Sequence, residues 1–283
     1  MYNAGRLRSG MLAGSPVVTI VVSIFVVLFG LAFGSFLNVC VARLPRHESI
    51  VRPGSRCPQC GAAIRVFDNL PLLSWVVLRG RCRDCHRQIP WRYPAVEFAT
   101  AALFLLSFLR FRLTLAGIGM AALCFLLLGL AVMDAETLRL PDAFTLPGIA
   151  LGIIYCGLLP AATTGTHLLD AALAALWAAL AAMAILIVRS AYYLVRHEEG
   201  MGIGDAKLLA MIAAWLGPWL TLLTLVLGVV AAAMLGMVMI AVGPRRGGGA
   251  KARLPFGAFL CAAAIYAIFA GRPIVHWYLR FFR

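Results

Sequence analysis

The sequence predicts an all-α polytopic membrane protein with about eight transmembrane helices and one small polar domain between the first two. Hydrophobic residues make up 63% of the 283 residues and charged residues only 13%, which leaves too little polar surface for a soluble protein of this length. The hydrophobic residues are grouped into runs close to the length of a bilayer crossing. Because lipid offers no hydrogen bonds to the peptide backbone, such runs are expected to be helices.

Eight apolar runs define the predicted membrane helices. They lie at residues 16–42, 95–109, 113–133, 143–160, 167–189, 206–217, 219–242 and 256–271. The run 206–217 is short and needs a tilt or neighbouring helices to complete a crossing. The predicted organisation is an N-terminal tail at 1–15, a first transmembrane helix at 16–42, a cytoplasmic four-cysteine domain at 43–94 and a membrane-embedded domain at 95–283.

Positive charge is unevenly distributed along the chain and predicts its orientation. The formal net charge is +14, and most of the 25 Lys and Arg residues fall in the loops that follow the first, third, fifth and seventh runs. Such loops stay on the cytoplasmic side of a membrane, which places 43–94 in the cytoplasm and both termini outside. Because these arginines already account for topology and for contact with anionic lipid, we expect membrane lipid and no nucleic acid as a partner.

The polar domain contains two Cys-x-x-Cys pairs, CPQC at 57–60 and CRDC at 82–85. Two such pairs predict a four-thiolate zinc site of the zinc-ribbon type, with Cys57, Cys60, Cys82 and Cys85 as ligands. Disulfides or redox chemistry are the alternatives, and a reducing cytoplasm disfavours stable disulfides. Four protein ligands leave no open position for a catalytic water, so the metal is expected to be structural. The other four cysteines lie in apolar runs and are interpreted as small packed hydrophobes.

Two acidic motifs stand at the predicted cytoplasmic boundary of the membrane. MDAETLRLPD at 133–142 holds Asp134 and Asp142, and GMGIGDAKLLA at 200–210 holds Asp205, flanked by Gly202, Gly204 and Lys207. Two carboxylates held together share a proton, so that one activates water while the other protonates a leaving group. This chemistry hydrolyses peptide bonds, but ion or proton transport would use the same pair. The alternative for Gly-x-Gly-Asp alone is a flexible loop with a helix cap.

The order and spacing of these motifs resemble those of the bacterial type IV prepilin peptidases, which are GxGD-type membrane aspartic proteases. The similar segments are GSFLNVCVARLP at 34–45, CPQC, DNLPLLSW at 68–75, LRGRCRDC at 78–85, RYPAVE at 92–97, the two aspartate motifs and LPFGAFL at 254–260. Each motif alone is weakly specific. Together they cover nearly the whole chain in the family's order.

The resemblance implies that Asp134 and Asp205 are the catalytic pair, with Pro141, Asp142, Gly202, Gly204 and Lys207 in supporting positions. An exchange of roles between Asp134 and Asp142 stays open. It also implies an enzyme of the bacterial inner membrane that removes the basic leader of type IV prepilins or type II secretion pseudopilins at the cytoplasmic face. Many members then methylate the new N-terminus with S-adenosylmethionine, although the chain has no glycine-rich nucleotide motif.

Two further hypotheses follow from the same residues. Glu198 and Glu199 lie in a charged loop before the second aspartate motif, where we expect them to attract the basic leader. The competing functions are a transporter that uses the same carboxylates, or a membrane-tethered zinc scaffold. Internal repeats and polar residues at mid-membrane would favour transport, and neither is evident. The scaffold hypothesis leaves the paired aspartates without a role.

Overall fold

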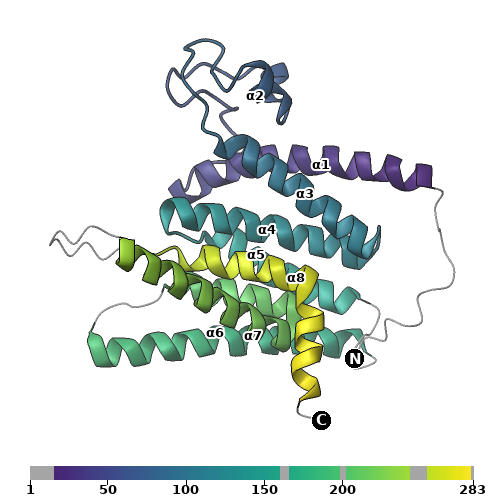
Figure 1. Ribbon diagram of the computed structural model, residues 1–283, viewed down its shortest axis with the longest axis vertical. Coiled ribbons are helices and arrows are strands. Elements are labelled where there is room, and N and C mark those ends of the chain that lie inside the picture. Colours follow the sequence, from purple (N-terminus) through teal and green to yellow (C-terminus); the bar gives the residue numbers. More distant parts are fainter. Residues whose placement is uncertain (1–15, 160–165, 198–201, 243–253, 282–283) are drawn as a thin grey trace. The chain divides into compact units, whose positions relative to one another are not determined.

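The computed structural model describes residues 16–159, 166–197, 202–242 and 254–281 (Figure 1). In these residues the secondary structure is helical, apart from two isolated β-bridges. The predicted all-α class is therefore confirmed. The predicted tail at 1–15 and the loop with Glu198 and Glu199 lie outside the described residues.

Ten helical elements follow one another along the described chain. They are α1 (Pro16–Arg43), η1 (Leu44–Arg46), η2 (Val66–Asn69), α2 (Leu73–Val77), α3 (Arg92–Phe111), α4 (Leu115–Thr137), α5 (Asp142–Leu158), α6 (His167–Arg196), α7 (Ile203–Val242) and α8 (Phe256–Arg280). Of these, α1, α3, α4, α6, α7 and α8 are long and apolar enough to cross a membrane, whereas α5 is a shorter apolar helix. The protein is thus a multi-pass membrane protein.

Helix α7 contains a break that reconciles this inventory with the eight predicted runs. It covers both the 206–217 and the 219–242 runs, but Gly217 has φ 71° and ψ −178°, outside the helical region. Pro218 follows and has no backbone N–H to continue the helix. The Thr221 hydroxyl donates to the Gly217 carbonyl at 2.6 Å, which satisfies one acceptor at the break. Counted on either side of Gly217, the described residues hold eight apolar helical segments.

The chain forms two compact units, one up to Phe125 and one from Leu126 onward, with the division inside α4. In the first unit, α1 packs against α3, and glycines on α1 set how closely they approach. A Cβ on Gly34 would lie 2.6 Å from the Glu97 Cα, and one on Gly30 would lie 2.7 Å from the Ala101 Cα. Small residues allow such contact between membrane helices, where hydrophobic association is weak.

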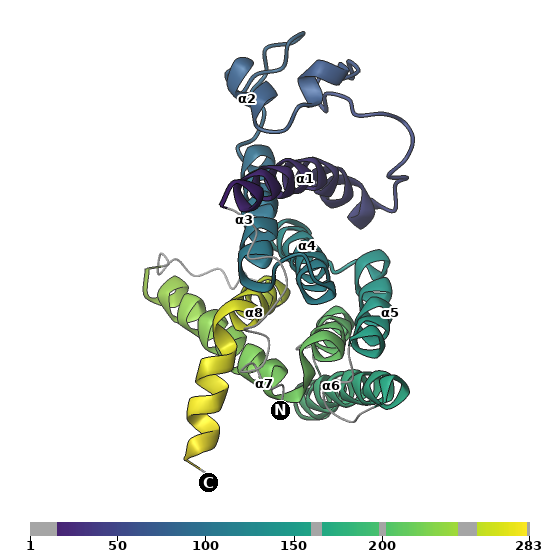
Figure 2. The same cartoon turned by 90° about the vertical axis from the view of Figure 1, so that its right-hand side faces the viewer.

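In the second unit α7 is the central helix, in contact with α5, α6 and α8 (Figure 2). Its first segment is almost wholly buried, from Ala206 to Trp215. The Trp215 indole donates to the Gly148 carbonyl of α5 at 2.8 Å and stacks on Tyr155 with ring centroids 4.8 Å apart. This packing fixes the start of α7, where the GMGIGDAKLLA motif lies.

Gly34→Ala is expected to destabilise the protein by about 1–3 kcal/mol, because its methyl group overlaps the backbone of α3. Thermal unfolding in detergent, followed by circular dichroism, measures the loss. Gly54→Ala is the matched control, since a Cβ there meets no atom within 4 Å. Alanine forms helices more readily than glycine, so only a steric clash with α3 would make Gly34→Ala less stable. A Gly34→Ala protein as stable as the wild type would therefore disprove the close approach of α1 to α3.

Candidate active site and candidate metal centre

Asp134 lies in the last turn of α4 and is only 5% exposed. Its Oδ2 atom accepts a hydrogen bond of 2.8 Å from the backbone N–H of Ala258. Helix α8 begins at Phe256, so this N–H lies in the first turn of the helix, where it is shared between Asp134 and the Pro255 carbonyl at 3.1 Å. The partial positive charge there complements the carboxylate. Two helices distant in sequence therefore meet at one buried carboxylate.

Gly257 makes this approach sterically feasible. A Cβ at Gly257 would lie 3.0 Å from Asp134 Oδ2 and 3.0 Å from the Leu140 Cδ1 atom. The segment LPFGAFL by itself indicates only a resemblance to the family and predicts no role for Gly257 or Ala258. One sequence signal could have indicated this contact, because Pro255 stands just before an apolar helix. A proline there marks a helix N-terminus, whose backbone N–H groups can bind an anion.

Asp205 is the third residue of α7 and closes its own first turn. Its Oδ2 accepts from the Gly202 N–H at 3.2 Å, and its own N–H donates to the Gly202 carbonyl at 3.2 Å. The side chain thus reaches back to the residue before the helix, as in a capping box. Asp205 therefore does cap its helix, as the alternative interpretation of Gly-x-Gly-Asp predicts. Capping alone does not explain why its carboxylate lies near that of Asp134.

Leu140 connects the two aspartate motifs. A Cβ on Gly204 would lie 3.1 Å from the Leu140 Cβ, and Gly257 faces the Leu140 Cδ1 from another side. Asp134 and Asp205 lie close enough for their charges to influence each other, and Cys261 of α8 is buried near both. The ends of α4, α7 and α8 therefore bring the two carboxylates into one neighbourhood.

Asp142 occupies a different environment. Its Oδ1 pairs with the Lys207 Nζ at 2.6 Å, and the two side chains are 57% and 32% exposed. Pro141 precedes α5, and its carbonyl accepts from the N–H groups of Phe144 and Thr145 in the first turn. The pair connects the starts of α5 and α7, but an exposed ion pair contributes only about 0–1 kcal/mol. The seven residues that the two motifs predict as catalytic or supporting all lie in the second unit: Asp134, Pro141, Asp142, Gly202, Gly204, Asp205 and Lys207.

The four cysteines of the two Cys-x-x-Cys pairs come together in the first unit. Their sulfur atoms all lie within 4.8 Å of one another, and the Cys57 and Cys85 sulfurs are 3.8 Å apart. Tetrahedral zinc with Zn–S bonds of about 2.3 Å holds its sulfurs about 3.8 Å apart. Among the described residues this is the one cluster of metal-ligand side chains. The geometry fits a four-coordinate metal ion.

Each cysteine pair sits on a tight turn of the same design. In the first, the Cys57 N–H donates to Ala62 and the Gly61 N–H donates back to Cys57. In the second, the Cys82 N–H donates to the Arg87 carbonyl, and the His86 N–H donates to the Cys82 carbonyl. An isolated β-bridge closes each turn, Arg56 with Ala63 and Arg81 with Gln88. Two equivalent turns therefore aim four sulfurs at one point without any regular strand in the described residues.

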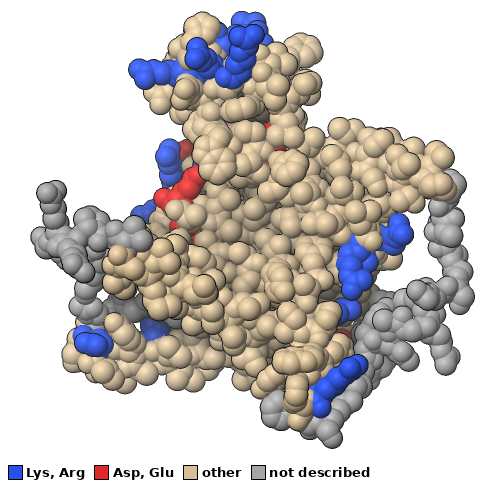
Figure 3. All heavy atoms as spheres, viewed as in Figure 1, with Lys and Arg blue, Asp and Glu red and all other residues tan. Residues whose placement is uncertain are grey.

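Local electrostatics support thiolate ligation and an ordered domain. The backbone N–H of Cys60 lowers the pKa of the Cys57 thiol, whereas burial and the neighbouring Cys85 and Cys57 raise the pKa of the Cys60 thiol, so Cys57 ionises more readily than Cys60. Arg83 forms a bidentate ion pair with Asp68, at 2.6 and 2.8 Å, and its hydrogen bonds hold the pKa of that carboxyl below its usual value. Lys and Arg side chains gather over the segment around α2, while charged side chains are sparse over the middle of the helices (Figure 3).

Comparison with known proteins identifies the family. Residues 28–111 match the bacterial peptidase A24 N-terminal domain, and residues 121–237 match the type IV leader peptidase family. A Pseudomonas putida protein is 36% identical over 87% of this chain and 90% of its own, and a Pseudomonas aeruginosa protein is 35% identical over 90% and 92%. The chain belongs to the type IV leader peptidase family. It is therefore an enzyme of the peptidase class.

Other relatives give the same result. A Legionella pneumophila protein is 33% identical over 89% of this chain and 92% of its own. All three relatives are named prepilin leader peptidase/N-methyltransferase. No solved structure matches the chain. The four clustered cysteines fall inside the first family match and both aspartate motifs inside the second, whereas Gly257 and Ala258 follow its end.

The purified protein is expected to contain about one zinc ion per chain, measured by mass spectrometry of the metal. Exchanging one ligand on each turn, Cys60→Ser with Cys85→Ser, should abolish that content and make residues 43–94 sensitive to protease, because a domain this small depends on its metal for folding. Cys156→Ser is the control, since a hydroxyl can keep the hydrogen bond that Cys156 makes to Ala214. Full metal content in the double variant would exclude the four-cysteine site.

Proposed function

We propose that this enzyme removes the basic leader from type IV prepilins or type II secretion pseudopilins at the cytoplasmic face of the bacterial inner membrane, and then N-methylates the new N-terminus. The names of its relatives support both activities. The observation that carries the peptidase proposal is the convergence of Asp134 and Asp205 at helix ends around Leu140.

In the proposed mechanism Asp134 and Asp205 work with one proton between them. The ionised carboxylate removes a proton from a water molecule, which attacks the scissile carbonyl carbon. The protonated carboxyl donates to the carbonyl oxygen, and the collapse of the tetrahedral intermediate transfers a proton to the leaving amine. Ala258 orients the Oδ2 atom of Asp134 from the backbone, which would hold this carboxyl group in place for proton transfer.

The depth of the site suits the proposed substrate. A prepilin leader is charged and a helix of apolar residues follows it, so the bond between them lies at the membrane boundary. Asp134 is in the last turn of α4 and Asp205 in the first turn of α7, and helix ends of spanning length lie at that boundary. A transporter would need its carboxylates near mid-membrane, so this placement favours hydrolysis.

The cysteine cluster has a structural role in this proposal. Cys57, Cys60, Cys82 and Cys85 would hold a zinc ion, which supplies folding energy to residues 43–94 and leaves no coordination position for substrate. The excess of Lys and Arg in this segment would keep it in the cytoplasm. Methyl transfer would use S-adenosylmethionine as the donor.

Asp134→Asn and Asp205→Asn should each reduce prepilin cleavage at least about a hundredfold, since each removes a group that transfers protons. Cleavage in detergent or liposomes is followed by the mobility shift of a purified prepilin, with metal content as the measure of folding. Asp142→Asn should cost at most about fivefold, because it removes only an exposed ion pair.

Asp170→Asn, a buried carboxyl in the first turn of α6, is the control expected to cleave at the wild-type rate. Cleavage that survives Asp134→Asn but is lost in Asp142→Asn would exchange the roles of these two residues. Cleavage that survives Asp205→Asn would overturn the carboxylate-pair mechanism altogether.

Gly257→Ala should lower kcat about tenfold with little change in KM, because the added methyl group displaces the Asp134 carboxylate and misplacement of a catalytic group is costly. Gly236→Ala in α7 is the matched control, because a Cβ there comes no nearer than 3.4 Å to a side chain. A wild-type kcat in Gly257→Ala would show that the first turn of α8 does not position Asp134.

A further inference from the structure

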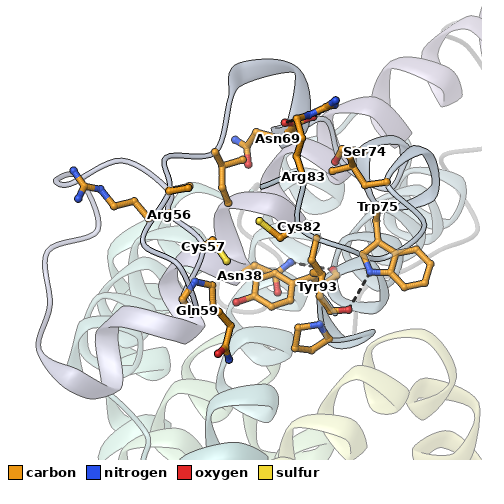
Figure 4. Close-up of a pocket in the computed structure, with 18 of the residues that line it drawn as sticks. Asn38, Arg56, Cys57, Gln59, Asn69, Ser74, Trp75, Cys82, Arg83 and Tyr93 are labelled. Atoms are coloured by element: carbon orange, nitrogen blue, oxygen red, sulfur yellow. Dashed lines mark hydrogen bonds and ion pairs between the residues drawn. The ribbon is translucent and has the colours of Figure 1, made fainter. Parts of the chain in front are cut away.

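The short helix α2 exposes an apolar face. Leu73, Val76 and Val77 are 58%, 65% and 66% exposed, and they recur at the spacing of one side of a helix. The Trp75 side chain, by contrast, lines a pocket inside the polar segment, where its indole donates to the Ile89 carbonyl at 3.3 Å (Figure 4). Packing within the segment therefore uses one side of α2 and leaves its other apolar side uncovered.

The first unit holds α2 at the depth of the bilayer. The Leu72 N–H, directly before α2, donates to Glu97 Oε2 at 2.8 Å. Glu97 lies against α1 at Gly34, where an added Cβ would be 2.6 Å from the Glu97 Cα. Gly34 precedes the end of α1 at Arg43 by nine residues, which is about 14 Å along a helix. With 28 residues, α1 is about as long as a bilayer with its headgroups is thick. Helix α2 therefore begins within the depth of the membrane rather than beyond it.

The backbone around α2 suits this depth. Unpaired backbone groups are costly in lipid, and most of the N–H groups here donate to acceptors of the first unit. These donors are Leu72, Leu73, Ser74, Val76, Leu78, Arg79, Gly80 and Arg81. The run from Pro71 to Leu78 also contains no charged residue. An uncharged turn with its backbone already hydrogen-bonded can enter the apolar edge of a leaflet.

A hollow of about 550 Å³ opens directly after α2. It is lined by the apolar end of α2 and by the start of the second cysteine turn: Val77, Leu78, Arg79, Arg81, Cys82, Arg83 and His86. None of these residues is acidic. Arg83 is already paired with Asp68, whereas Arg79 and Arg81 form no ion pair with any described residue. Two guanidinium groups beside an apolar surface suit a phosphate ester that carries an apolar tail.

Two residues that line this hollow keep a backbone conformation that favours glycine. Arg79 has φ 51° and His86 has φ 54°. In the first cysteine turn the position equivalent to His86 is Gly61, with φ 72°. A left-handed backbone is costly for a residue with a side chain. Glycine would relieve this strain, so the side chains of Arg79 and His86 have a use that offsets it.

We propose that α2 and this hollow bind an anionic phospholipid of the adjacent leaflet. Leu73, Val76 and Val77 lie among the acyl chains just below the headgroups. Arg79 and Arg81 bind the lipid phosphate, and each such side chain near an anionic leaflet strengthens binding about fivefold. The same positive charge repels the basic leader of the proposed substrate, so this surface suits lipid better than prepilin. The contact attaches the polar segment to the membrane between its two helical tethers, α1 and α3.

Hydrogen–deuterium exchange of the full-length wild type in nanodiscs, measured by mass spectrometry of its peptides, tests the site. The amides of residues 72–81 should exchange about tenfold or more slowly in phosphatidylglycerol than in phosphatidylcholine, whereas residues 55–64 of the first cysteine turn should exchange equally in both. Equal exchange of residues 72–81 in the two lipids would overturn the proposal. So would slowing in phosphatidylcholine on addition of inorganic phosphate, which indicates a soluble anion, or only on addition of prepilin, which indicates a protein partner.

Two double variants separate the contributions of charge and apolar surface. Arg79→Gln with Arg81→Gln should abolish the difference between the two lipids, because glutamine is polar but carries no charge. Val76→Ser with Val77→Ser should speed the exchange of residues 72–81 about fivefold or more in both lipids, because either lipid can bury the valines. Unchanged exchange of residues 55–64 shows that a variant keeps its fold.

The matched control is Arg46→Gln with Val51→Ser, an exposed arginine and an exposed valine of the same polar segment that lie outside α2 and the hollow. This variant should exchange like the wild type in each lipid. A lipid preference that survives the loss of Arg79 and Arg81 would overturn the phosphate site. A preference that the control also loses would reduce the effect to the total positive charge of the segment.

Discussion

The second unit depends on one hydrogen bond, from the Ala258 N–H at the start of α8 to the buried carboxylate of Asp134 at the end of α4. A carboxylate at a membrane-embedded helix end is costly unless a partner replaces its water. A helix N-terminus is such a partner, since its first N–H groups are unpaired and carry partial positive charge. This constraint explains why α8 begins after a proline and why glycine precedes Ala258.

Glycine recurs wherever this protein needs helices in close contact. Gly34 permits α1 to touch the backbone of α3, Gly257 permits α8 to approach Asp134, and Gly148 and Gly152 leave room on α5 for the side chains of Met211 and Trp215. Within lipid the hydrophobic effect does not drive helices together, so close packing and hydrogen bonds must do so. The packing of α7 on α5 in turn holds Asp205 in a defined position at the start of α7.

The two units provide two different chemical environments. In the second, carboxylates stand at helix ends surrounded by packed apolar side chains, an environment that strengthens their mutual influence. In the first, a polar segment of short turns brings four cysteine sulfurs together.

The sequence alone determined the class of the protein, its eight apolar segments and the two pairs of cysteines, because these depend on local composition and spacing. It also placed Asp134 and Asp205 at helix ends. Only the tertiary structure separated Asp134 from Asp142: one is buried against α8, whereas the other is paired with Lys207 and exposed. It alone revealed that Ala258 donates to Asp134 and that Leu140 lies beside both Gly204 and Gly257. These features arise from contacts between helices distant in the chain, which no local pattern encodes.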